Sequence, residues 1–169
     1  MKLSRAILFG GLTVGVLDAL DAVVFFGVRY GVGPVRIFQS IAAGLLGKAS
    51  FQGGRSTALL GVVLHFCVAT IIAGIYILAS RRLTTLARRP FLWGPLYGIV
   101  AYLVMNLVVI PLSAAGSGQK PPIVVLNGLL IHIFGVGIPS ALWARRALAT
   151  GAKTPLPRFP AWSRGGERP

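Results

Sequence analysis

Long apolar runs separated by short polar stretches dominate this chain. Four runs, at about 6–28, 57–79, 91–112 and 122–144, hold few charged residues. A helix needs about 20 mainly apolar residues to cross a hydrocarbon layer of about 30 Å, so each run is long enough to span a membrane. Backbone polar groups cannot stay unpaired in lipid, which makes a helix the expected form of each run. The pattern predicts an all-α membrane protein in which residues 1–146 form an antiparallel bundle of four transmembrane helices.

A shorter amphipathic stretch at 35–47 lies between the first two runs. It has too few residues to cross a bilayer. On a helical wheel its large apolar side chains share one face: Ile37, Phe38, Ile41 and Leu45. Small and polar side chains share the other face, which is typical of a helix that lies in the membrane interface. We expect such an interfacial helix. A re-entrant hairpin is the alternative, because backbone can leave the helical form at this depth where protein covers it.

The composition agrees with a membrane protein. Hydrophobic residues make up 55% of the 169 residues and charged residues only 12%, whereas a typical soluble domain has about 25% charged residues. The formal net charge of +14 could indicate a nucleic-acid partner. The Lys and Arg residues stand at the ends of the apolar runs, however, and no soluble domain gathers them. We therefore predict the lipid bilayer as the partner and no nucleic acid.

The distribution of these cations predicts an orientation. Twelve Lys and Arg residues lie before the first run, between the second and third runs, or after the fourth, and five lie in the other connections. The positive-inside rule then places both termini in the cytoplasm.

The first run also has some features of a cleaved signal peptide, since Lys2 and Arg5 precede it. The run continues to Val28, however, and a cut after Ala22 would place Leu20 where a small residue is required. We expect this segment to remain as a transmembrane helix.

The remaining segments are expected to add little to the fold. The basic, Pro-rich segment 147–169 is predicted to be a disordered cytoplasmic tail that lies near anionic headgroups. The outer connection SAAGSGQKPP, residues 113–122, is interpreted as a short loop without chemistry. The single cysteine, Cys67, lies inside the second run, so an internal disulfide is excluded and its redox state is left open.

Ionisable and amide side chains occur at one depth in all four runs. At about 1.5 Å per residue, they lie roughly 18 to 22 Å from the cytoplasmic end: Asp18, Asp21, His65, Asn106 and His132. Asp18 and Asp21 are two of only three acidic residues in the chain. A charged Asp near the bilayer centre costs about 2.5 to 3.5 kcal/mol, so two on one helix require partners. We expect the aspartates and histidines to form one polar group inside the bundle, with Asn106 at its edge.

Glycines recur at helical spacing on the same runs. Those expected to pack helices together are Gly11, Gly15, Gly61, Gly94, Gly98, Gly128 and Gly135. Small residues let helix backbones approach closely, and lipid-facing positions gain nothing from being small. The first and third runs share a GxxxG pattern and the second and fourth a GxxxH pattern, which suggests a duplicated hairpin. The stripes could pair within one chain or between chains, so a homo-oligomer is left open.

Three functions are open for the polar group. Aspartates three residues apart beside imidazoles could bind or relay a proton, or take up a small solute. The same side chains could instead form a network that only fixes helix packing, in a structural or accessory subunit. His65 and His132 lie at similar depth on two helices and could be the axial pair of a b-type haem in an electron carrier. We find no metal-ligand spacing, phosphate loop or nucleophile motif, so an enzyme is not favoured and no other cofactor is expected.

Four segments of the sequence are similar to segments of known proteins: GGLTVGVLDALDA, QSIAAGLLGKASFQGG, LHF at 64–66 and YGIVAYLVMNLVVIPLSA. Together they resemble a group of four-span bacterial inner-membrane proteins of unknown function, over about residues 6–146. The resemblance implies a multi-pass protein of the bacterial cytoplasmic membrane. It carries over no catalytic residue, because no activity is established for that group.

Overall fold

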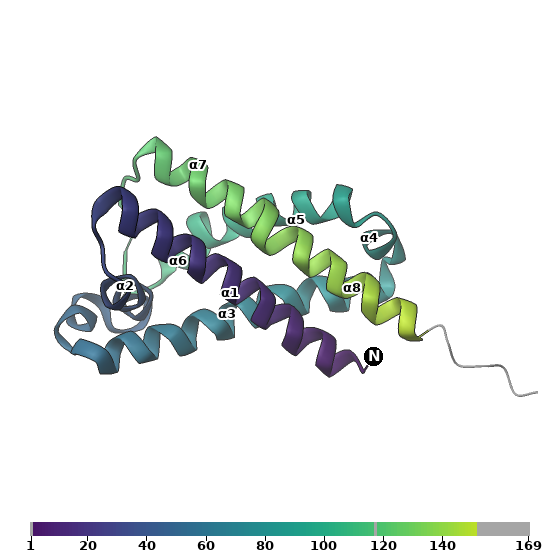
Figure 1. Ribbon diagram of the computed structural model, residues 1–169, viewed down its shortest axis with the longest axis horizontal. Coiled ribbons are helices and arrows are strands. Elements are labelled where there is room, and N and C mark those ends of the chain that lie inside the picture. The colour runs from purple at the N-terminus through teal and green to yellow at the C-terminus, as the bar shows by residue number, and fades with distance from the viewer. Residues whose placement is uncertain (1, 117, 152–169) are drawn as a thin grey trace, which may run out of the picture.

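The computed structural model describes residues 2–116 and 118–151, which form helices and turns without a strand. Four helical rods in this part of the chain are long and apolar enough to cross a membrane: Leu3–Tyr30, Gly54–Arg82, Pro90–Leu112 and Pro122–Ala149. The prediction of an all-helical chain with four such helices is confirmed. Successive rods run in opposite directions (Figure 1).

Shorter elements join and interrupt the four rods. The first two rods are α1 (Leu3–Tyr30) and α3 (Gly54–Arg82), joined by α2 (Pro34–Leu46) and the 3-10 helix η1 (Gly47–Gln52). After the short helix α4 (Thr84–Arg88), the third rod consists of α5 (Pro90–Val104), the π-helix η2 (Met105–Val109) and α6 (Ile110–Leu112). The fourth consists of α7 (Pro122–Ile131), the π-helix η3 (His132–Gly137) and α8 (Ile138–Gly151).

Helix α8 continues beyond the apolar run that predicted it. The run was expected to end near residue 144 and the tail to begin at 147, but α8 extends to Gly151. Ala147, Leu148 and Ala149 are strong helix formers, which explains the extension. Residues 152–169, where most of the predicted disordered tail falls, lie outside the described part of the chain.

The two π-helical segments have a common cause. A proline follows each of them closely, at Pro111 and Pro139. Proline has no N–H to donate, and its ring clashes with the carbonyl four residues earlier, which falls inside η2 or η3. A wider turn relieves this clash without ending the helix. Asn106 and His132, both predicted site residues, lie in these widened turns.

One end of the bundle is tightly packed. The N-terminus, α4 and the end of α8 lie together there, and α2 lies at the opposite end (Figure 1). The buried core at this end is formed by Ala6, Tyr76, Ile77, Ala87, Ala141 and Ala144. Four of these six residues are alanines, so the helix backbones come close together. The hydroxyl of Tyr76 is satisfied by a 3.0 Å hydrogen bond to the carbonyl of Leu86.

Helix α2 packs across the start of α3. A Cβ placed on Gly61 would lie only 1.9 Å from the carbonyl oxygen of Phe38, so the α2 backbone rests directly on that glycine. Gln39 turns toward α3, is 5% exposed and donates a 3.0 Å hydrogen bond to the carbonyl of Gly54. A helix was expected here, and one is present; its position in the membrane interface stays a prediction.

The seven glycines expected to pack helices all lie against another element of the same chain. A Cβ at any of them would come within 4 Å of a residue from a different helix. Gly11 and Gly15 of α1 face Thr70 and Phe66 of α3, while Gly98 of α5 faces the backbone of η3. The remaining positions are Gly61, Gly94, Gly128 and Gly135.

Candidate functional site

A cavity of about 250 Å³ opens inside the bundle, between α1, α3, the third rod and the fourth rod. All five side chains expected to form the polar group line it, together with three polar side chains that were not expected. The eight polar residues are Asp18, Asp21, His65, Tyr102, Asn106, Lys120, Asn127 and His132. We call this the polar cavity. It has room for several water molecules, since each occupies about 30 Å³ in the liquid.

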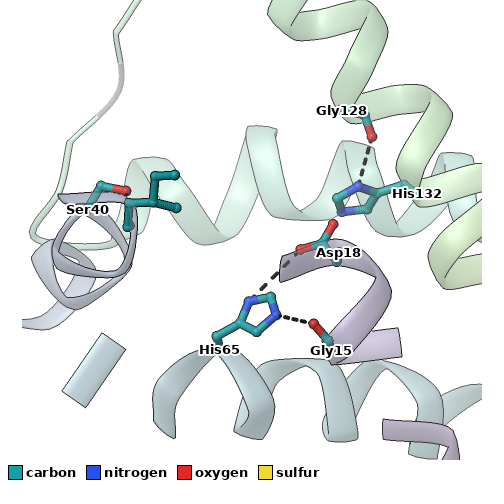
Figure 2. A network of polar contacts seen from close by, with 7 residues as sticks. Gly15, Asp18, Ser40, His65, Gly128 and His132 are labelled. Atoms are coloured by element: carbon teal, nitrogen blue, oxygen red, sulfur yellow. Dashed lines mark hydrogen bonds and ion pairs between the residues drawn. The ribbon is translucent and has the colours of Figure 1, made fainter. Parts of the chain in front are cut away.

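Asp18 lies between the two histidines, which come from two other rods (Figure 2). Its Oδ2 atom is 4.0 Å from Nδ1 of His65, which is beyond hydrogen-bonding distance. The Asp18 side chain is 28% exposed and that of His65 is 11% exposed. Within the described residues the Asp18 carboxylate accepts no hydrogen bond.

Each histidine is fixed by one backbone carbonyl. Nε2 of His65 donates to the carbonyl of Gly15 at 2.8 Å, and Nδ1 of His132 donates to the carbonyl of Gly128 at 2.9 Å. Because a carbonyl only accepts, these bonds assign the proton to that nitrogen in each ring. The second nitrogen of each ring is then left to face Asp18 or the cavity (Figure 2).

Asp21 has a different environment from Asp18. Its Oδ2 atom accepts a 2.7 Å hydrogen bond from the side-chain amide of Asn127. Asn127 was not among the predicted site residues, although an amide in an otherwise apolar run indicates a candidate. The two aspartates therefore differ in their contacts: Asp21 accepts a hydrogen bond from another helix, and in the described part of the chain Asp18 accepts none.

Lys120 reaches the polar cavity from the connection between the third and fourth rods. Its ammonium donates a hydrogen bond to Oδ1 of Asn106, whose amide in turn donates to the carbonyl of Tyr102 at 2.9 Å. Burial lowers the pKa of the Lys120 ammonium below its ordinary value. This connection was expected to carry no chemistry; the structure places Lys120 in the lining of the polar cavity, directly before Pro121 and the start of α7 at Pro122.

The geometry bears on the haem alternative as well. In this arrangement Nε2 of His65 is bonded to Gly15, and the Asp18 carboxylate lies between the two rings (Figure 2). An iron bound by that nitrogen would require the bond to Gly15 to break, and an iron shared by both rings would need the space that the Asp18 carboxylate occupies. Among residues 2–116 and 118–151, no group of three or more His, Cys, Asp or Glu side chains could hold a metal ion.

No protein-family model, curated protein or solved structure matches this chain. The resemblance to four-span bacterial inner-membrane proteins therefore stays a prediction.

Proposed function

We propose that this chain is an integral membrane protein that binds and exchanges protons at Asp18, inside the polar cavity of its helix bundle. The observation that carries the proposal is the position of the Asp18 carboxylate, between His65 and His132 and without a hydrogen-bond donor from the described residues. Asp21, three residues away, has such a donor in Asn127.

Energetics favour proton binding at this position. A charged Asp near the bilayer centre costs about 2.5 to 3.5 kcal/mol, and a group without a protein donor depends on cavity water, a cation or a proton to lower that cost. A proton removes the charge altogether. His65 and His132 lie on either side of Asp18, and each ring has one nitrogen that is not bonded to a backbone carbonyl, so both rings are placed to pass protons to and from Asp18.

Access to Asp18 should come from the end of the bundle that carries α2. The polar cavity extends toward that end, where Lys120 forms part of its lining. The opposite end is closed by the alanine-rich core around Tyr76 and Ile77. A lysine at the rim would favour protons and small polar solutes over multivalent cations, which its charge repels.

Proton flux in proteoliposomes tests the proposal. With an imposed potential and a pH-sensitive dye inside the vesicles, Asp18→Asn should lower the flux at least about tenfold, because the amide keeps hydrogen bonding but has no titratable proton. Asp21→Asn is the matched control, since its amide oxygen can still accept from Asn127. Equal flux from wild type and Asp18→Asn, in vesicles with equal protein content, would exclude Asp18 as the proton site.

A purely structural role is the alternative, and two contacts favour it. The bond from His65 to Gly15 joins α3 to α1, and the bond from Asn127 to Asp21 joins α7 to α1. If these are the whole purpose of the polar group, the protein is an accessory membrane subunit. Asp18→Asn should then leave both flux and stability close to wild type, while Asp21→Ala should lower the unfolding free energy.

Four apolar helices support a multi-pass membrane protein. We propose the bacterial cytoplasmic membrane as its location, with both termini in the cytoplasm, on the basis of the cation distribution.

A further inference from the structure

A second groove lies at the packed end of the bundle, away from the polar cavity. It has a volume of about 520 Å³ and runs between α8 and Thr13 of α1. Its polar lining consists of Thr13, Trp143, Arg145 and Arg146, and its apolar lining of Pro139, Leu142 and Ala149. We call it the Trp143 groove. Nothing in the proposed proton exchange at Asp18 uses this groove.

The indole of Trp143 is held in a defined position. Its Nε1 donates a 3.0 Å hydrogen bond to Oγ1 of Thr13, and its ring stacks on Phe9 with centroids 5.8 Å apart. The guanidinium carbon of Arg146 lies 5.2 Å from the centroid of the same ring. The ring therefore fixes one cation at the edge of the groove, beside the exposed Arg145.

The groove is polarised along the membrane normal. Pro139 lies seven residues before Arg146, so the helix rise separates them by about 10 Å, with the proline deeper in the bundle. If this rod spans a bilayer, Pro139 and Leu142 face the acyl region, while both guanidinium groups and Ala149 lie nearer the end of the rod, where headgroups are found. Trp is common at this boundary because its ring is apolar and its N–H is polar.

We propose that the Trp143 groove binds one anionic glycerophospholipid, with its phosphate on Arg145 and Arg146 and part of an acyl chain along Pro139 and Leu142. Charge complementarity supports this occupant, since guanidinium groups bind phosphate through paired charge-assisted hydrogen bonds. Basic pockets between transmembrane helices are a recognised form of anionic headgroup site. A free phosphate would use only the charged end and leave the apolar end without a partner.

Lipid binding to the purified full-length protein tests the proposal. Native mass spectrometry would compare phosphatidylglycerol with phosphatidylcholine on wild type and on Arg145→Gln/Arg146→Gln. Each cation near an anionic headgroup contributes about a fivefold gain in affinity, so we expect the double variant to bind phosphatidylglycerol about twenty-fivefold more weakly. Arg145→Gln alone should give about a fivefold loss. Both side chains are exposed, so the fold should be retained.

The matched control is Arg88→Gln/Arg89→Gln. These exposed arginines belong to the same end of the bundle, at the end of α4 and just after it, but do not line the Trp143 groove. An equal loss of affinity in both double variants would overturn the proposal in favour of general surface charge. No loss in Arg145→Gln/Arg146→Gln would show that these arginines do not hold the headgroup and would also overturn it. Displacement of phosphatidylglycerol by inorganic phosphate at equal concentration would overturn it in favour of a free phosphate site.

Discussion

Asn127 and Asp21, separated by 106 positions in the sequence, share a 2.7 Å hydrogen bond inside the polar cavity. The bond joins α7 to α1 and gives the Asp21 carboxylate a donor, whereas Asp18 has none among residues 2–116 and 118–151. The two carboxylates, three residues apart on one helix, therefore have different hydrogen-bonding environments.

A double-mutant cycle on this pair should show coupling. With Asp21→Ala, Asn127→Ala and the double variant, we expect a coupling energy of about 0.6 kcal/mol, with about 1.7 kcal/mol as the upper end for hydrogen bonds between membrane helices. Unfolding by sodium dodecyl sulfate in mixed micelles gives the four free energies. Strictly additive effects would contradict a direct bond between the two side chains.

Gly98→Ala should strongly lower the free energy of unfolding, although it adds only one methyl group. The new Cβ would lie 2.2 Å from the carbonyl oxygen of His132, so α5 and η3 would have to separate. We expect a loss of about 1 to 3 kcal/mol in the same unfolding assay, the usual range for overpacking. Gly33→Ala is the control, because a Cβ there meets nothing within 4 Å and its backbone angle suits alanine. Similar stability for both variants would argue against the close approach of α5 and η3.

Lys120 should make stability depend on pH in the alkaline range. Burial lowers its pKa below 10.5, so between that lowered pKa and 10.5 the unfolded chain binds more protons than the folded protein. The contribution of Lys120 to stability therefore rises with pH across this window. Thermal unfolding from about pH 8 to pH 10.5 should show a shallower rise for Lys120→Gln than for wild type or Lys48→Gln. Identical slopes for all three proteins would contradict the lowered pKa.

Cysteine labelling checks the orientation. The Cys67→Ser variant provides a background for single cysteines at three positions. A cysteine at 85 reports the side of the connection between α3 and α5, one at 118 that of the connection between α6 and α7, and one at 155 that of the segment after α8. We expect an impermeant thiol reagent, added outside intact cells, to label only residue 118, because the cation-rich segments face the cytoplasm. Labelling of residue 85 from the outside would invert the topology.

The sequence was sufficient to predict those parts of the structure that depend on hydrophobic periodicity and on the length of apolar runs. The four long helices and the helix at 35–47 follow from apolar patterns. The five predicted polar residues reach one cavity because they lie at a similar depth on the four rods, with Asp18 and Asp21 both on α1. Depth along a helix depends only on residue count, which a sequence contains. The direction in which a side chain points depends on how each helix is rotated about its axis in the bundle. A helical wheel constrains this rotation less well than residue count constrains depth.

Lys120 and Asn127 show where this reasoning failed. Lys120 was assigned to a loop and counted only as an outer charge, because nothing in the local pattern indicates that its side chain turns back onto Asn106. Asn127 stands only five residues into α7, and its partner lies 106 positions away. The widened turns before Pro111 and Pro139 were also not anticipated, although both prolines were visible inside apolar runs.

The alanine-rich core at the packed end has a kinetic consequence. Alanine has no rotatable side chain, so a passage cannot form between Ala6, Ala141 and Ala144 by rotamer changes. Opening that end requires whole helices to move apart, a collective motion that takes microseconds to milliseconds. At the other end, Lys120 is part of the cavity lining, and rotation of its exposed side chain away from Asn106 takes picoseconds to nanoseconds. We therefore expect the polar cavity to equilibrate with one side of the membrane orders of magnitude faster than with the other.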